Sequence, residues 1–136
     1  HLNEADGPVF KIRHDPRFTS FGKFLSHTAL DELPQLINIV KGDMRFVGPR
    51  PLPVYEAKHI PKRYANRFSI LPGITSLWVV RGGHTLSFQE WMELDLFYVT
   101  QRSVFLDIYI CFQTIVLIRT MSLKYLLKNR RQELFQ

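Results

Sequence analysis

Two adjacent carboxylates, Asp31 and Glu32, are the residues of this chain best suited by type and spacing to chemistry. A carboxylate can attack an activated phosphorus atom and hold the phosphoryl group covalently, which divides one difficult displacement into two easier ones. A neighbouring carboxylate can bind Mg²⁺, which neutralises the charge of a diphosphate and of its leaving group. The pair therefore indicates metal-assisted phosphoryl transfer. The alternative is that both side chains only complement a helix dipole, as acidic residues in a first turn commonly do.

A short downstream loop could bind the phosphate. Arg50 lies between two prolines in the run Gly48-Pro49-Arg50-Pro51. Its guanidinium is planar and permanently charged, and this geometry suits phosphate oxygens. The alternative is a surface turn whose arginine is only ion-paired.

Other polar residues are weaker candidates. Asp95 and Asp107 lie among large apolar residues, so each needs an arginine, a helix N-terminus or a metal as its partner. For Asp107, a place in the first turn after Ser103 is explanation enough. The histidines show no metal-ligand spacing, so we expect no zinc site, although His27 and His84 could contact phosphate.

The composition favours a folded domain with anionic partners. The chain has 136 residues, of which 46% are hydrophobic, enough for one domain with a core. Its net charge of +6 favours phosphate, nucleic acid or an acidic membrane surface. The single cysteine, Cys111, excludes an internal disulfide framework and is expected to be a buried, unreactive thiol.

The carboxylate pair needs a helix to position it. Leu33, Leu36, Ile37 and Val40 repeat at helical spacing, and Pro34 is tolerated only in a first turn. The pattern predicts a helix from near Asp31 to a stop at Gly42. Asp31 and Glu32 would then lie at the positive end of its dipole.

The remaining pattern predicts an α+β fold that is mostly α. We expect a compact helical domain with a small strand or hairpin element and amphipathic helices at a membrane interface. The expected elements are a short strand at 9–13, a short helix at 18–25, a helix at 54–68 interrupted by Pro61, a strand at 74–80, a helix to about 99 opened by the capping box of Ser87 and Glu90, and a last helix from Ser103 to about 128 or beyond.

A membrane surface is an expected partner. The longest apolar stretch, 104–118, is shorter than the roughly 20 residues of a spanning helix, so we expect it to lie on a bilayer or pack in the core. Aromatic and basic residues mix at 55–68 and in the last helix, as they do at headgroup level. A basic face could also follow nucleic acid, but no reading motif is present, so we expect no such partner.

Seven short motifs follow one another along the chain. They are Asp15-Pro16-Arg17-x-Thr19, Leu30-Asp31-Glu32-Leu33-Pro34-Gln35-Leu36-x-Asn38, Lys41-Gly42-Asp43-Met44, Val47-Gly48-Pro49-Arg50-Pro51, Pro72-Gly73-Ile74-Thr75, Glu93-Leu94-Asp95-x-x-Tyr98-Val99 and Leu106-Asp107-Ile108. In this order they resemble the bacterial sugar transferase family, the small monotopic polyprenyl-phosphate phosphoglycosyl transferases. The resemblance covers about residues 7 to 120.

The resemblance implies a ping-pong reaction that initiates glycan assembly for capsules, exopolysaccharides, O-antigens or glycoproteins. An aspartate attacks the β-phosphate of a UDP-sugar, UMP leaves, and the phosphosugar passes to a polyprenyl phosphate. Asp31 would be the nucleophile, Glu32 the Mg²⁺ ligand and Arg50 a phosphate contact. Asp107 matches another acidic position of the family's active site. The implied location is the cytoplasmic face of the bacterial inner membrane, and further candidate phosphate contacts are Arg17, Arg81 and His84.

The chain departs from the family pattern at several positions. Ser26 stands where the family usually has an arginine, Ala29 where it usually has a serine, and Arg81-Gly82-Gly83-His84 where it commonly reads Asn-Gly-Arg-Asn. Each charged phosphate contact is worth about 1.5–3 kcal/mol, so losing two would slow turnover unless Arg81 or His84 replaces them. A second hypothesis is therefore a degenerate member that binds a membrane or a partner without turnover.

We interpret residues 1–136 as a single domain of the catalytic type. The family's N-terminal membrane hairpin is not in this sequence, and we expect the native gene to encode it.

Overall fold

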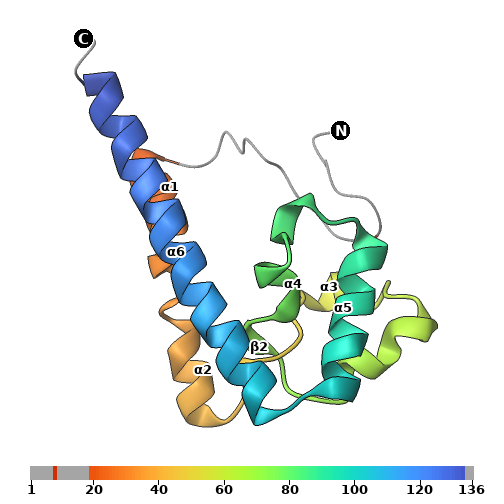
Figure 1. Ribbon diagram of the computed structural model, residues 1–136. Helices are drawn as coiled ribbons and strands as arrows, with labels where there is room; N and C mark the ends of the chain where they lie inside the picture. Colours follow the sequence, from red (N-terminus) through yellow and green to blue (C-terminus); the bar gives the residue numbers. More distant parts are fainter. Residues whose placement is uncertain (1–7, 9–18, 134–136) are drawn as a thin grey trace.

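The computed structural model describes residue 8 and residues 19–133, which form a mostly helical α+β domain, as predicted (Figure 1). The strand expected at 9–13 lies outside the described residues. In chain order the elements are α1 (Ser20–Thr28), the 3₁₀ helix η1 (Leu30–Glu32), α2 (Gln35–Lys41), β1 (Arg45–Val47), α3 (Val54–Ala57), the 3₁₀ helix η2 (Lys62–Phe68), β2 (Gly73–Thr75), α4 (Leu77–Val80), the 3₁₀ helix η3 (Gly83–Thr85), α5 (Phe88–Gln101) and α6 (Val104–Glu133).

The long helix α6 runs along one side of the molecule and extends beyond the rest of it (Figure 1). Its contacts are with α1, α4 and both strands, while α5 packs against η2 and α4. As predicted, Ser103 begins α6, because its hydroxyl accepts the Leu106 N–H at 3.2 Å. The predicted capping box of α5 is also confirmed, with both Ser87 and Glu90 bonds present.

The prediction of one strand over 74–80 is wrong. β2 ends at Thr75, and α4 begins at Leu77 because the Ser76 hydroxyl accepts the Val79 N–H at 3.3 Å and caps the new helix. Burial of Leu77 and Trp78 outweighs the strand preference of the β-branched residues that follow. The strand that the pattern missed, β1, pairs with β2 in parallel, with Arg45 opposite Gly73.

The predicted helix start at Asp31 is also wrong. Asp31 and Glu32 belong to η1, and α2 begins only at Gln35. Pro34 has no N–H to donate to the Leu30 carbonyl, so this carbonyl accepts the Leu33 N–H in a tighter 3₁₀ turn. The acidic pair therefore precedes α2 by about a turn, beyond the range in which a helix dipole acts strongly. Gly42 ends α2 in the left-handed conformation, as predicted.

Residues 54–68 are helical only in two short pieces. α3 ends at Ala57 and η2 begins at Lys62, so Pro61 marks the interruption, as predicted.

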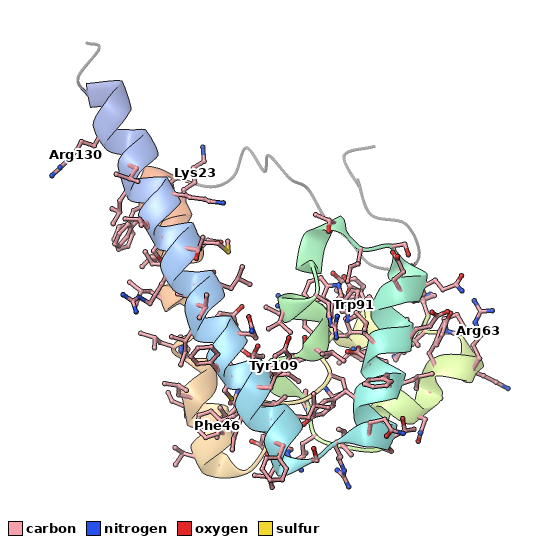
Figure 2. All side chains as sticks on the ribbon, viewed as in Figure 1. Lys23, Phe46, Arg63, Trp91, Tyr109 and Arg130 are labelled. Atoms are coloured by element: carbon pink, nitrogen blue, oxygen red, sulfur yellow. The ribbon has the colours of Figure 1, made fainter. Side chains whose placement is uncertain are left out.

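The core consists of two clusters on either side of α4. One contains Trp78 of α4 and Trp91 of α5, whose rings stack at 4.8 Å. Figure 2 shows Trp91 on the side of α5 that faces α4. The other contains Val47, Leu77, Tyr98 and Ile110, and the half-buried Cys111 packs against it.

An ion pair is buried at the centre of the α5–η2 contact. Arg67 Nη2 lies 2.7 Å from Asp95 Oδ2, and both side chains are 1% exposed. The predicted need of Asp95 for a partner is thus met by an arginine. Burial raises the pKa of the Asp95 carboxyl to about 6, although the charge of Arg67 acts in the opposite direction. Arg67 Nη2 also donates to the Arg50 carbonyl at 2.9 Å, which links the pair to a loop.

Helix α6 is longer than the apolar stretch suggested. Its segment Val104–Leu127, 24 residues, is long and apolar enough to cross a membrane by length and composition alone. The expectation that the stretch was too short is therefore wrong, because the apolar pattern continues past Arg119. Only 6% of its most apolar window is buried, so most of this segment lies outside the core, to which it contributes Ile110.

We predict that Arg67→Met lowers the free energy of unfolding by about 3–5 kcal/mol, because it leaves the Asp95 carboxyl buried without a counter-charge. The folded pKa of Asp95 then rises further above about 6. A carboxyl whose folded pKa is raised favours the folded state at low pH, and this contribution is lost as the pH rises toward the raised pKa. The free energy of unfolding that Arg67→Met removes should therefore be larger near pH 8 than near pH 5. Urea unfolding at both pH values measures this.

The matched control is Arg63→Met, on the same 3₁₀ helix, where the side chain is exposed and lies over the Tyr64 ring. It should cost about 0.5–1 kcal/mol at either pH. Equal losses of unfolding free energy in the two variants, or a pH-independent loss in Arg67→Met, would contradict the role of Arg67 as the counter-charge of the buried Asp95 carboxyl.

Candidate active site

The 3₁₀ helix η1 presents both carboxylates at the surface. Asp31 is exposed and Glu32 is about one-third exposed, with a side-chain value of 31%. The backbone enters η1 through Ala29, whose φ of 56° is left-handed and ends α1. This sharp turn separates η1 from α1, so the acidic pair forms the tip of a corner between α1 and α2.

The loop that carries Arg50 is fixed by two glycines. The Gly48 N–H donates to the Thr75 carbonyl and the Gly73 N–H donates to the Pro49 carbonyl, each at 3.0 Å. A Cβ at Gly48 would lie 2.8 Å from Gly73 N, and one at Gly73 would lie 2.1 Å from Gly48 N. Only glycine permits this approach of the two backbones. The loop is therefore rigid where it leaves β1. The hydrogen bond from Arg67 to the Arg50 carbonyl also fixes the backbone at Arg50.

Arg50 reaches from this loop to the acidic pair. Its Nη1 lies 3.9 Å from Glu32 Oε1, and its guanidinium carbon lies 5.7 Å from the centroid of the Trp78 ring. Two residues predicted from separate words of the sequence are thus brought together. Asp31, next to Glu32, has no ion pair or hydrogen bond within the part of the chain that the structure describes, so its carboxylate is open to a ligand.

Asp107 lies in a second cluster, at the start of α6. The Tyr98 hydroxyl donates to Asp107 Oδ1 at 2.6 Å, and Arg45 Nη2 lies 4.0 Å from Oδ2. Burial raises the pKa of the Tyr98 phenol, and the neighbouring Asp107 raises it further, so this hydroxyl remains a donor. None of the described contacts joins this cluster to Glu32 or Arg50. Arg45 is the first residue of β1, whereas Arg50 lies in the loop that follows the last residue of β1.

The other predicted contacts are placed only in part. Arg81 is exposed and follows α4 three residues after Trp78, so it lies about one helical turn from the residue under Arg50. His84 belongs to η3, but its side chain is outside what the structure describes, as is that of His27 in α1. Arg17 lies wholly outside the described residues. The roles of all these residues remain predictions.

The departures from the family pattern occupy accessible places. Ser26 is exposed on α1. Gly83 has a φ of 50°, and a Cβ there would meet nothing within 4 Å. Space for a side chain therefore exists at Gly83, but the backbone is left-handed, which other residues adopt at a cost. The loop after α4 has a conformation suited to glycine.

The donor atoms can be tested against Mg²⁺. Among the described residues, no three His, Cys, Asp or Glu side chains gather as a metal cage. Mg²⁺ usually takes one or two carboxylates and completes its shell with water and substrate phosphates. Exposed Asp31 and half-buried Glu32, adjacent in the chain, fit that description and not that of an all-protein cage.

Sequence reasoning missed two residues that contribute to this region. Arg45 was not considered, because β1 is too short to show a strand pattern. Trp78 was taken as a strand residue, although it lies under Arg50. The signal that could have found Arg45 is its position between two apolar residues, Met44 and Phe46, which favours an outward basic side chain on a strand.

The comparisons with known proteins agree in one family. The sequence model described as bacterial sugar transferase matches residues 1–121. The galactosyl transferase CpsE of Streptococcus agalactiae is 41% identical over 114 residues, which are 83% of this chain and 25% of the relative. The undecaprenyl-phosphate galactose phosphotransferase of Salmonella typhimurium is 40% identical over 105 residues, 77% of this chain and 22% of the relative.

A third relative is the UDP-glucose:undecaprenyl-phosphate glucose-1-phosphate transferase of Escherichia coli. It is 40% identical over 111 residues, which cover 76% of this chain and 24% of the relative. The chain thus spans about a quarter of the length of these curated relatives. The family model and the identities together show that this chain belongs to the bacterial sugar transferase family.

Proposed function

We propose that the chain carries the catalytic site of a phosphoglycosyl transferase, which moves a phosphosugar from a UDP-sugar to a polyprenyl phosphate and so begins glycan assembly. The observation that carries this proposal is the 3.9 Å approach of Arg50 to Glu32 beside the open carboxylate of Asp31. A nucleophile, a candidate metal ligand and a phosphate-binding cation thereby share one surface. The names of relatives that act on undecaprenyl phosphate support the substrate class.

The chemistry divides into two displacements. In the first, an Asp31 oxygen bonds to the β-phosphorus, the bond from this phosphorus to the bridging oxygen breaks, and UMP leaves with that oxygen. In the second, a phosphate oxygen of the polyprenyl phosphate attacks the same phosphorus and restores the Asp31 carboxylate. Arg50 binds the non-bridging oxygens in both steps and stabilises the charge that gathers there.

Mg²⁺ is proposed as the cofactor, with Glu32 as its protein ligand and Asp31 close by. When bound, it would neutralise diphosphate charge and stabilise the departing UMP. Within the chain, Arg50 keeps Glu32 oriented toward the loop, because the two side chains form an ion pair across the gap between η1 and the end of β1. The Trp78 ring supports the guanidinium from the core side.

A bilayer surface is the second part of the proposal, with the cytoplasmic face of the inner membrane as its location. The exposed surface of α6 is apolar in its first half and carries basic residues as well in its second half, and Figure 2 shows Tyr109 on its lower half and Arg130 at its upper end. Up to Val116 its exposed apolar residues recur every three or four positions. The full set in the helix is Val104, Phe105, Ile108, Tyr109, Phe112, Ile115, Val116, Met121, Leu123, Leu126 and Leu127. Exposed Arg119, Lys124 and Arg130 on the same helix favour anionic lipids.

We predict that incubation with a panel of UDP-sugars and Mg²⁺ gives a phosphosugar adduct in intact mass spectrometry, and that Asp31→Asn abolishes it. A carboxamide is not a nucleophile at phosphorus, so the loss should be about 10³-fold or more. The matched control is Asp43→Asn, another exposed aspartate just after α2, which should keep the adduct. An adduct that survives in Asp31→Asn would overturn the assignment of the nucleophile.

We predict that Phe112→Glu weakens binding to vesicles containing anionic lipid by about tenfold or more, because it removes about 1.5–3 kcal/mol of apolar burial and adds a repelled charge. Vesicle co-sedimentation measures this. Thr120→Glu is the matched control, since it adds the same charge at an exposed position of α6. Equal losses in both variants would argue that charge alone governs binding, against insertion of the apolar face.

A second candidate function is a non-catalytic family member that binds a membrane or a partner. The observation that favours it is the glycine conformation at position 83, where the family commonly has an arginine, together with Ser26 on α1.

We predict that Ser26→Arg combined with Gly83→Arg raises the rate of UMP release about tenfold, because it restores two charged contacts to phosphate.

Gly83→Ala combined with Ser26→Lys is the control, since it repeats the backbone strain and adds a charge without a planar fork. Turnover that appears only in the double-arginine variant supports the non-catalytic reading of the natural chain. Turnover in the natural chain that the arginines leave unchanged excludes it.

A further inference from the structure

Helix α6 contacts both strands of the small sheet over a short stretch. Of the α6 side chains that the structure describes, only that of Ile110 is buried, and it packs in the cluster that contains Val47 of β1. One helical turn further along, the Thr114 hydroxyl oxygen lies 2.6 Å from that of Thr75 in β2. The apolar contact is non-directional, whereas a hydrogen bond has a defined geometry. The two threonines therefore set the register of α6 along the strands.

The direction of this hydrogen bond follows from the protons that the two hydroxyls can donate. The Thr114 hydroxyl donates to the Ile110 carbonyl at 2.8 Å, so its single proton is engaged. The Thr75 hydroxyl is then the donor, and Thr114 Oγ1 is the acceptor. Thr75 is buried, and its hydroxyl has no other partner among the residues that the structure describes. Loss of the Thr114 oxygen would leave a buried donor without an acceptor, which folded proteins avoid.

Thr75 also holds two parts of the candidate active site. Its carbonyl accepts the Gly48 N–H at 3.0 Å, at the point where the loop that carries Arg50 leaves β1. The next residue, Ser76, caps α4, and this helix places the Trp78 ring under the Arg50 guanidinium. A shift of Thr75 would therefore move both the base of the loop and the ring that supports its arginine.

We propose that Thr114 and Thr75 are positioning residues for Arg50, through which α6 fixes the loop that binds phosphate. The inference rests on the proposed function and adds to it a role for α6 that is separate from contact with a bilayer. The connection runs from Thr114 Oγ1 to the Thr75 side chain, and from the Thr75 carbonyl to the Gly48 amide. An arginine that must be in place when charge develops on phosphate oxygens is sensitive to small displacements of this kind.

The first test measures hydrogen exchange of backbone amides by NMR and uses no substrate. Thr114→Val removes the hydroxyl and keeps the branched shape of the side chain. The Gly48 amide should exchange about tenfold faster in this variant, because the strand that carries its acceptor is released. The Trp91 amide in α5, which donates to the Ser87 carbonyl, should stay within about twofold. Thr114→Ser keeps the hydroxyl and should restore the protection of Gly48.

Thr120→Val is the matched control for the loss of a threonine hydroxyl from α6. Thr120 is exposed, and its hydroxyl donates to the Val116 carbonyl at 2.8 Å, as that of Thr114 does to Ile110. It has no bond to another described element, so neither amide should change. An unchanged Gly48 amide in Thr114→Val would overturn the inference. Equal acceleration of the Gly48 and Trp91 amides would overturn it too, because it would indicate a general loosening of the fold.

The second test measures how fast the phosphosugar adduct forms on Asp31 over a range of UDP-sugar concentrations with Mg²⁺. Thr114→Val should lower the maximal rate constant about tenfold and leave the half-saturating concentration within about threefold. The reason is that a displaced Arg50 loses contact with the charge of the transition state more than with the bound donor. Thr114→Ser should recover the rate constant to within about twofold, and Thr120→Val should leave it unchanged.

A double-mutant cycle with Arg50→Ala decides whether the effect passes through this arginine. Once the guanidinium is removed its position no longer matters, so Thr114→Val should change the rate constant of Arg50→Ala by less than about twofold. A further tenfold loss in the double variant would show that Thr114 acts on another group, against the inference. A natural chain that forms no adduct would refute the transferase, and the exchange of the Gly48 amide would still decide whether α6 fixes the loop.

Discussion

The buried guanidinium of Arg67 is the constraint on which the rest of the structure depends. It donates to Asp95 of α5 through two nitrogens, at 2.7 and 3.0 Å, and to the Arg50 carbonyl at 2.9 Å. One side chain thus ties η2, α5 and the loop after β1 together. A buried charge is tolerated only when it is paired and hydrogen-bonded, so the three segments cannot separate without a large cost.

The surface site follows from this buried scaffold. The close contact between Gly48 and Gly73 fixes the point at which the loop leaves β1. The hydrogen bond from Arg67 fixes the position of the Arg50 carbonyl. The exposed Arg50 side chain then has a fixed base from which to reach Glu32. Precise placement of a flexible arginine is what phosphate chemistry requires, since the interaction must be ready when charge develops. The acidic pair itself remains open because η1 is a surface corner.

Much of this could be predicted from the sequence, and the failures have physical causes. The caps of α5 and α6, the stop at Gly42 and the need of Asp95 for a partner depend on local bonds or on a strict burial rule, so residue types reveal them, although the sequence did not identify Arg67 as that partner. The boundary at Ser76 and the 3₁₀ turn at Asp31 depend on capping and on one missing N–H, which outweigh β-propensity and helical periodicity. The sequence predicted Arg50 and Glu32 as candidate site residues from two separate motifs, but it did not predict that the two side chains meet. Their meeting depends on the parallel pairing of two three-residue strands, which no local pattern encodes.

We propose that the Asp31 carboxylate takes the phosphosugar before the lipid arrives. Exchange of radiolabelled UMP into UDP-sugar, measured without any polyprenyl phosphate, tests it most directly. We expect exchange that requires Mg²⁺ and ceases in Asp31→Asn, because return of UMP to a covalent intermediate regenerates the donor. Exchange that begins only when polyprenyl phosphate is added, with none before it, would contradict a covalent intermediate on Asp31 and indicate direct transfer between the two substrates.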